Sequence, residues 1–354
     1  MANPGSGIFF RVDGGRSVGM GHVMRCLSLA RILRERYRYA VSFCMNQDEV
    51  GISRVQSLGF PVVRVGADDF YGAAQGEALI IDLPGGAPAE VVRSLRAEHP
   101  QTLMVLMDGT CSGRLEADLV ISPLERLPDA SSWTGFRGQR YEGPAYAIVD
   151  PAFAQIPRRT TSVVDVPHLL VTMGASDPCG LTLQALRALD AMPEVFHTTV
   201  AVGPAFLHDP ILQSWLTGAR RHYEIRREDS LLDLMTVSDL AVVSFGTTVY
   251  ELAAAGLPAI ALSISEDHAQ SAEIFAGHGS LITLGLFSSV TSEKIKDAVQ
   301  QLINDPAPRL AMTKRGQSLV DRHGAERVAE LLVSRIKDKR TSRTEERIGT
   351  SQRA

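Results

Sequence analysis

The chain has 354 residues, and its 36 Lys and Arg against 40 Asp and Glu give a formal net charge of -4. Hydrophobic residues make up 45% and charged residues 21%, which is typical of a folded globular protein and excludes disorder over most of the length. The length predicts about two domains of ordinary size. The weakly acidic balance predicts no general attraction to nucleic acid or to an anionic membrane.

The cysteines and the apolar runs favour a cytoplasmic protein. The spacings of the four cysteines match no zinc-site or disulfide framework (Cys26, Cys44, Cys111 and Cys179). No run reaches the roughly 18 apolar residues that a membrane-spanning helix needs. Residues 1–7 have neither the basic start nor the apolar core of a signal peptide.

Short apolar runs alternate with amphipathic stretches in the first 150 residues. Gly7–Val12 predicts a strand, and Gly21–Tyr37 predicts a helix from apolar residues at helical spacing. The continuous apolar run Ala78–Ile81 is typical of a sheet that is covered on both faces. This alternation predicts a parallel α/β layer. Further strands are predicted at Ala40–Met45, Pro61–Val65, Ala78–Leu83, Thr102–Asp108 and Asp118–Ser122, and a helix at Ala89–Glu98.

The same alternation restarts after two polar breaks, at Glu125–Arg140 and Ala154–Pro167. We therefore predict two Rossmann-like α/β domains, residues 1–150 and 151–336. The tail, residues 337–354, is basic and lacks apolar periodicity, which predicts disorder. Strands are predicted in the second half at His168–Met173, Thr198–Val202, Leu240–Ser244 and Pro258–Ile264, and helices at Leu181–Leu189, Ala205–Leu216, Thr248–Ala255, Ser292–Asn304 and Ala325–Ile336.

The first candidate site is the loop Asp13–His22, which joins the first predicted strand to the first helix. Its four glycines allow a close backbone approach to a ligand, and a helix N-terminus favours an anion. The loop has neither the G-x-G-x-x-G spacing of a dinucleotide fold nor the Lys of a P-loop. His22 stands at the helix start, where the dipole favours the neutral imidazole that can accept a proton. Alternatively, His22 only caps or packs there.

Two further loops follow predicted strands of the second half. Gly174 and Ser176 lie in a short turn that suits phosphate, although Ser176 or Asp177 could simply cap the next helix. The backbone N–H groups and hydroxyls of Ser244-Phe-Gly-Thr-Thr248 suit a diphosphate, and Glu251 could accept both hydroxyls of a ribose. Glu251 could instead be a capping-box partner of Thr248. Because ligands of open α/β sheets bind beyond the carboxyl ends of the strands, we expect a cleft at the domain boundary.

These residues carry a family resemblance. Phe10-Arg-Val-Asp13 and Gly19-Met-Gly-His-Val-Met-Arg-Cys-Leu27 resemble the N-terminal signature of the UDP-sugar hydrolases of pseudaminic acid biosynthesis. Those hydrolases are two-domain GT-B proteins related to the glycosyltransferase that makes lipid II. The resemblance runs from Gly7 to Ile336 and continues in the segments Gly143–Ala147, Pro151–Phe153, Gly174–Pro178, Ser244–Thr248, Glu251–Pro258 and His323–Val328.

The resemblance implies a metal-independent enzyme without a cofactor, in which His22 activates water to displace UDP with inversion and Asp13 assists by orienting His22. Backbone dipoles and helix ends would stabilise the leaving diphosphate. The implied UDP site consists of Gly174, Ser176, Ser244, Gly246, Thr247, Thr248 and Glu251, and the implied sugar site of Arg16, Gly19, Gly21, Asp267 and His268.

Three segments depart from the family pattern where the sugar or the nucleophile is touched: Gly14–Arg16, Leu83-Pro84 after Asp82, and Asp267-His268. His22 could therefore equally deprotonate an alcohol or a nucleobase amine. An inverting glycosyltransferase that moves the sugar to a small acceptor such as a nucleoside is the second interpretation. A nucleotide-sugar binding module without turnover is the third. The expected partners are a UDP-sugar and either water or a small acceptor.

Overall fold

The computed structural model describes residues 7–16, 18–66, 69, 76–107, 110–124, 130–160, 166–227 and 230–351, of which 130, 131 and 342–351 by their backbone alone. The chain divides into two compact units. The first unit consists of Met1–Gly14, His22–Ile148 and His323–Ala354, and the second of Gly15–Gly21 and Val149–Arg322.

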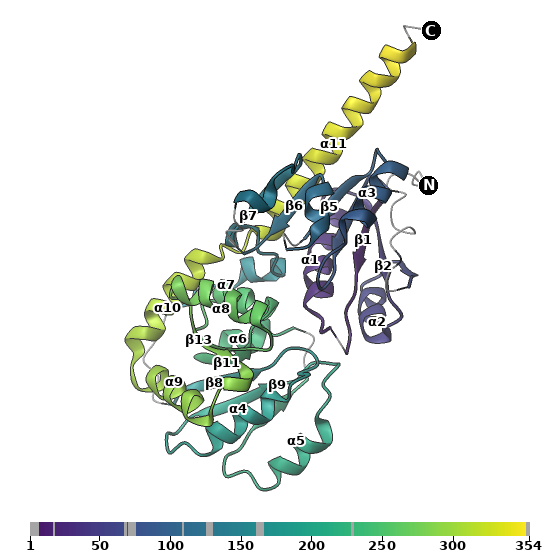
Figure 1. Ribbon diagram of the computed structural model, residues 1–354. Coiled ribbons are helices and arrows are strands. Elements are labelled where there is room, and N and C mark those ends of the chain that lie inside the picture. The colour runs from purple at the N-terminus through teal and green to yellow at the C-terminus, as the bar shows by residue number, and fades with distance from the viewer. Residues whose placement is uncertain are drawn as a thin grey trace. The chain divides into compact units, whose positions relative to one another are not determined.

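A parallel sheet forms the centre of the first unit (Figure 1). It has seven strands in the order β3-β2-β1-β4-β5-β6-β7. The apolar residues of β4 are all buried, as expected for a strand that is covered on both faces. The strands are β1 (Gly7–Val12), β2 (Ala40–Met45), β3 (Val62–Arg64), β4 (Ala78–Asp82), β5 (Leu103–Leu106), β6 (Leu119–Ser122) and β7 (Gln139–Glu142); the connecting helices include α1 (Gly21–Glu35), α2 (Glu49–Ser57) and α3 (Ala89–Glu98).

The second unit repeats this plan with six parallel strands in the order β10-β9-β8-β11-β12-β13. In both units the order reverses beside the first strand, which is the doubly wound topology of nucleotide-binding folds. The strands are β8 (His168–Thr172), β9 (His197–Ala201), β10 (Glu224–Arg226), β11 (Leu240–Ser244), β12 (Ala259–Ser263) and β13 (Leu281–Leu286); the helices are α4 (Leu181–Asp190), α5 (Asp209–Leu216), α6 (Leu232–Val237), α7 (Thr247–Ala255), α8 (Glu266–Gly277), α9 (Ser292–Asn304) and α10 (Pro306–Leu319).

The predicted fold class, two Rossmann-like α/β domains, is confirmed. The buried core strands lie close to their predicted positions, because long apolar runs are the strongest signal in such a sequence. The prediction missed three strands that all lie at sheet edges: β7, β10 and β13. β7 and β10 are short and polar and therefore lack the apolar run of a central strand, whereas β13 is apolar but only partly buried.

The C-terminal helix corrects the expectation of a disordered tail. Helix α11 (Gly324–Ser351) continues through the predicted end at Ile336 and belongs to the first unit, not the second. Its apolar side chains Val328, Leu332 and Ile336 are buried. Beyond them Lys339 donates from Nζ to Thr102 O and to Asp118 Oδ2, both at 2.9 Å. Charged residues that resemble a solvated tail in the sequence therefore form ion pairs with the first unit.

No helix in the described part of the chain combines the length and the apolar character needed to cross a membrane. Helix α11 is long, but its sequence is rich in charged residues.

We predict that Lys339→Met lowers the free energy of unfolding by about 1–2 kcal/mol, because it leaves the half-buried Asp118 carboxylate short of a charged donor. Urea denaturation would measure the change. Lys337→Met on the same helix is the matched control, since Lys337 is exposed. Equal stability of the two variants would contradict the ion-pair role of Lys339.

Candidate functional site

The first candidate site lies where the strand order of the first unit reverses, between β1 and β4. His22 is the second residue of α1, which follows β1, and Asp82 is the last residue of β4. His22 Nδ1 lies 2.7 Å from Asp82 Oδ1, and the two side chains are 26% and 1% exposed. Because an ionised carboxylate only accepts, the shared proton lies on Nδ1. Nε2 of this partly exposed ring is then the nitrogen that can take a proton.

Arg25 and Cys26 complete the surroundings of Asp82. Arg25 Nε donates to Asp82 Oδ2 at 2.6 Å, and Arg25 Nη2 pairs with Oδ1. Cys26 Sγ donates to Oδ2 at 3.3 Å. Burial by itself raises the pKa of Asp82, but Arg25 and His22 outweigh it and hold the pKa well below its usual range. Asp82 is therefore ionised at neutral pH and can accept from His22.

The thiol of Cys26 is a donor here and not a nucleophile. Burial, together with the negative charge of Asp82, raises the pKa of Cys26 well above its ordinary value. The thiol therefore stays protonated at neutral pH, and a protonated thiol is a weak nucleophile.

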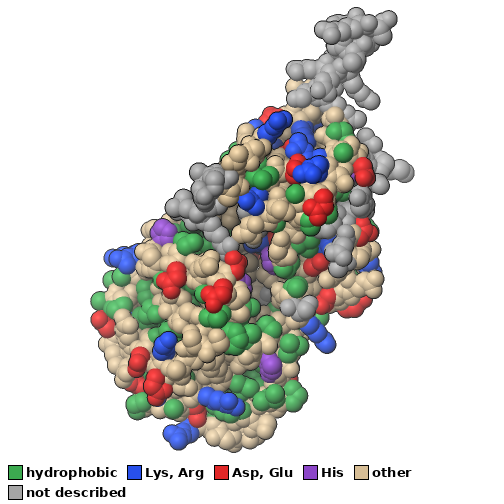
Figure 2. Space-filling model, in the orientation of Figure 1, with side chains coloured by type: hydrophobic (Ala, Val, Ile, Leu, Met, Phe, Trp, Pro, Cys, Tyr) green, Lys and Arg blue, Asp and Glu red, His purple; other side chains and the backbone are tan. Residues whose placement is uncertain are grey.

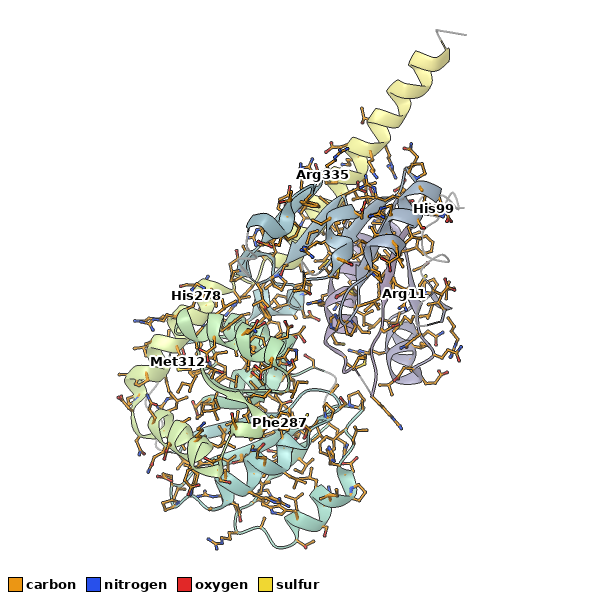
Figure 3. The ribbon with its side chains drawn as sticks, viewed as in Figure 1. Arg11, His99, His278, Phe287, Met312 and Arg335 are labelled. Atoms are coloured by element: carbon orange, nitrogen blue, oxygen red, sulfur yellow. The ribbon has the colours of Figure 1, made fainter. Side chains whose placement is uncertain are left out.

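Asp13 has different partners from those expected. Its Oδ1 accepts from Arg11 Nη1 at 2.6 Å and from the backbone N–H of Asn46 at 2.7 Å. Arg11, labelled in Figure 3, is fully buried and also donates from Nε to Asp69 O at 3.1 Å. These bonds tie together the carboxyl ends of β1 and β2. The resemblance implies that Asp13 orients His22, and in the structure Asp82 makes this contact instead.

The glycine-rich loop before α1 forms a tight turn. Gly15 and Gly19 exchange two backbone hydrogen bonds of 2.9 Å, and the φ angle of +75° at Gly19 favours a residue without a side chain. Arg16 is exposed, and Gly21 is the first residue of α1. The N–H groups of Gly15 and Gly19 are therefore used within the loop and are not presented to a ligand.

The second candidate site lies where the strand order of the second unit reverses, between β8 and β11. Gly174 follows β8 with a φ angle of +78°, and a Cβ added to it would lie 3.7 Å from Ser244 Oγ at the end of β11. Ser176 is buried. Asp177 accepts the N–H groups of Leu181 and Thr182 at 2.8 and 2.9 Å. The carboxylate of Asp177 therefore caps α4, as one of the two sequence interpretations proposed.

Helix α7 opens toward free space in this site. Its N-cap is Gly246, which has no side chain to satisfy the first N–H groups of the helix. A Cβ added to Gly246 would meet no atom within 4 Å. Thr247 and Thr248 form the first turn and are half-buried. The N–H groups and hydroxyls together suit a phosphate or diphosphate.

Glu251 lies one turn inside α7 and is half-buried. Burial and the nearby carboxylate of Asp150 raise the pKa of Glu251 from 4.5 to about 7. Because Gly246 is the N-cap, the capping-box pairing of Glu251 with Thr248 does not arise. Asp150 itself caps the 3₁₀ helix η5 (Pro151–Gln155), where it accepts the N–H of Ala152 at 2.9 Å. Glu251 is thus a half-buried acid whose ionisation is disfavoured, and it has no capping role.

Asp267 and His268 lie in the first turn of α8, after β12. Ser265 caps this helix and accepts the N–H of His268 at 3.2 Å. The imidazole of His268 packs against Phe245, with 5.9 Å between the ring centroids. Both residues therefore lie at the carboxyl edge of the sheet that also carries the α7 site.

Among the described residues no group of three or more His, Cys, Asp or Glu side chains is arranged to hold a metal ion.

The comparisons with known proteins agree with this architecture, although the chain matches no family model. It is 28% identical over 335 residues to the spore coat polysaccharide biosynthesis protein SpsG of Bacillus subtilis, covering 92% of this chain and 97% of the relative. It is 23% identical over 367 residues to the UDP-N-acetylglucosamine–N-acetylmuramyl-(pentapeptide) pyrophosphoryl-undecaprenol N-acetylglucosamine transferase of Xanthomonas oryzae, covering 93% and 80%.

Two solved structures have the same fold. MurG of Acinetobacter baumannii has a TM-score of 0.64 at 16% identity, covering 93% of this chain and 99% of MurG. HepE of Anabaena in complex with UDP-glucose has a TM-score of 0.59 at 12% identity, covering 94% and 99%. The chain therefore has the GT-B fold, with two Rossmann-like domains.

We predict that Glu251→Gln stabilises the protein in a pH-dependent way. The folded pKa of about 7 exceeds the ordinary 4.5, so ionising Glu251 costs folding free energy as the pH rises between these values. The variant lacks this loss. It should be more stable than the wild type by roughly 1–3 kcal/mol at pH 8 and nearly equal at pH 4.5.

Urea denaturation at the two pH values measures the effect of Glu251→Gln. Glu273→Gln, at an exposed position of α8, is the matched control. A stability gain that is the same at both pH values would contradict the assigned burial of charge.

Proposed function

We propose that this protein is an inverting glycosyltransferase-type enzyme that displaces UDP from a UDP-sugar, with His22 as the general base. The observation that carries the proposal is the pairing of His22 with the buried, ionised Asp82 at the point where the strand order of the first unit reverses. A carboxylate–imidazole pair with one accessible ring nitrogen is the arrangement expected of a proton acceptor.

The second unit would hold the nucleotide half of the donor. The N–H groups at the start of α7, with Thr247 and Thr248, would bind the diphosphate. Glu251 would accept the ribose hydroxyls, which would offset the cost of its burial. In support, one relative is named as a UDP-N-acetylglucosamine-dependent transferase, and one structure of the same fold contains UDP-glucose.

In the proposed reaction the acceptor oxygen attacks the anomeric carbon while the bond from that carbon to the diphosphate oxygen breaks. The electron pair of the broken bond leaves with UDP, and the helix N-terminus of α7 stabilises the added negative charge. Nε2 of His22 takes the acceptor proton. Asp82 stabilises the imidazolium that forms, and Arg25 keeps Asp82 ionised. A single displacement of this kind inverts the anomeric configuration.

The names of the relatives favour an organic acceptor, because one is a sugar transferase and another belongs to polysaccharide biosynthesis. The resemblance of Gly19–Leu27 to the UDP-sugar hydrolases supports water as the second candidate acceptor. A panel of UDP-sugars incubated with and without nucleosides and sugar alcohols separates the two. UDP release that depends on the acceptor supports transfer, release in buffer alone supports hydrolysis, and no release from any donor contradicts both.

We predict that His22→Ala lowers kcat by about 10²–10⁴-fold and leaves the affinity for UDP nearly unchanged, since the base acts in the transition state. Steady-state kinetics and isothermal titration with UDP measure the two quantities. His278→Ala, at an exposed position labelled in Figure 3, is the control. Full activity of His22→Ala would remove His22 as the general base, whereas UDP binding without turnover in the wild type would indicate a binding module.

Asp82→Asn should also lower kcat, by about 10²–10⁴-fold, because the amide can leave His22 in the wrong tautomer. The pH–rate profile distinguishes this effect from simple destabilisation. Asp13→Asn is the informative comparison, because Asp13 bonds Arg11 and not His22. We expect Asp13→Asn to lower Tm while the pH–rate profile keeps its wild-type form. An unchanged profile in Asp82→Asn would remove Asp82 from the mechanism.

A further inference from the structure

The first unit contains a cavity of about 200 Å³ at the end of the sheet that lies opposite to His22. The first residues of β5, β6 and β7 lie in its wall, so it lies at the amino ends of these strands. Helices α3 and α11 supply the other walls. The described lining residues that carry charge are Arg96, Asp118, Arg137, Arg335, Asp338 and Lys339.

Four cationic and two acidic side chains line this cavity, an excess of two positive charges. Figure 2 shows Lys and Arg side chains gathered beside acidic ones on the first unit. Lys339 and Arg96 pair with Asp118 at 2.9 and 3.5 Å, and Arg335 pairs with Asp338 at 3.2 Å. The two carboxylates are therefore compensated within the lining.

Two cationic groups retain donors that no described residue satisfies. Arg137 is exposed and makes no hydrogen bond or ion pair within the described residues. Arg335 donates from its two terminal nitrogens to Asp338 and to Tyr141 Oη, but its buried Nε has no partner. A buried N–H without an acceptor is unfavourable, so Arg335 retains donor capacity that a bound anion could use.

We propose that this cavity binds a phosphate-type anion between Arg137 and Arg335. A guanidinium presents paired donors that match the oxygens of a phosphate, and the excess positive charge favours a dianion. The site lies away from the carboxyl ends of the strands, where His22 acts, and its carboxylates are engaged in ion pairs. It would therefore bind a ligand without transforming it, and UDP would not compete for it.

Isothermal titration of inorganic phosphate into the full chain, with saturating UDP to occupy the α7 site, tests the proposal. We expect phosphate to bind the wild type at low ionic strength and to bind more weakly as salt screens the charges. Arg137→Gln and Arg335→Gln should each weaken binding about five- to tenfold. Arg187→Gln, at an exposed position of α4, is the matched control and should leave the affinity unchanged.

The absence of phosphate binding by the wild type, or equal affinity in Arg137→Gln, would overturn the proposal. This outcome is separate from the proposed enzymatic function, because UDP release and phosphate binding are measured independently. If UDP does not bind, phosphate could occupy the α7 site as well. Arg137→Gln would leave phosphate binding at the α7 site intact, whereas it would weaken phosphate binding in the cavity.

A phosphate group can also come from a lipid. Co-sedimentation with vesicles of phosphatidic acid in phosphatidylcholine, against phosphatidylcholine alone, distinguishes this source. Binding to the acidic vesicles that Arg137→Gln loses would assign the cavity to a headgroup. Binding of inorganic phosphate without vesicle binding would assign it to a small soluble anion. Failure of both probes would overturn the site.

Discussion

The buried carboxylate of Asp82 is the constraint around which the first unit's site is built. A carboxylate removed from water must be compensated, and here the compensation comes from three residues within one turn of α1: His22, Arg25 and Cys26. The first turn of the helix is thereby fixed against the end of β4. The hydrogen bond between His22 and Asp82 compensates the buried carboxylate, and it also fixes the tautomer of the imidazole.

Both candidate sites arise from the same topological feature. The strand order reverses beside β1 in the first unit and beside β8 in the second, and ligands of open α/β sheets bind beyond the carboxyl ends of the strands at such a point. The two reversal points carry different chemistry. In the first, a carboxylate and an imidazole are paired, whereas in the second a glycine leaves a helix N-terminus open and a half-buried acid waits one turn away.

Hydrophobic periodicity predicted the fold class and the core strands, because burial on both faces produces apolar runs such as Ala78–Ile81. It could not predict β7, whose residues are polar at an edge, or the length of α11, whose charged residues find partners on distant strands. His22, Gly246 and Glu251 lie in segments that follow strand ends, as predicted, and their roles stay predictions. The resemblance implies that Asp13 orients His22, whereas the sheet order brings Asp82 to this position. The sequence signal for this partner is that Asp82 follows directly on the buried apolar residues of β4.

The path of the chain at Ala147 and Gly324 has a consequence for the architecture. A side chain at Gly324 would collide with Ala147 O. The last residues before the second unit and the first residues of α11 therefore lie next to each other in space. Apart from Gly15–Gly21, the whole second unit is thus spliced into the first between neighbouring backbone positions. Val149–Arg322 resembles a domain inserted into the first unit, and it could be expressed as one continuous segment. To express the first unit alone, Ile148 would have to be joined to His323 by a short linker.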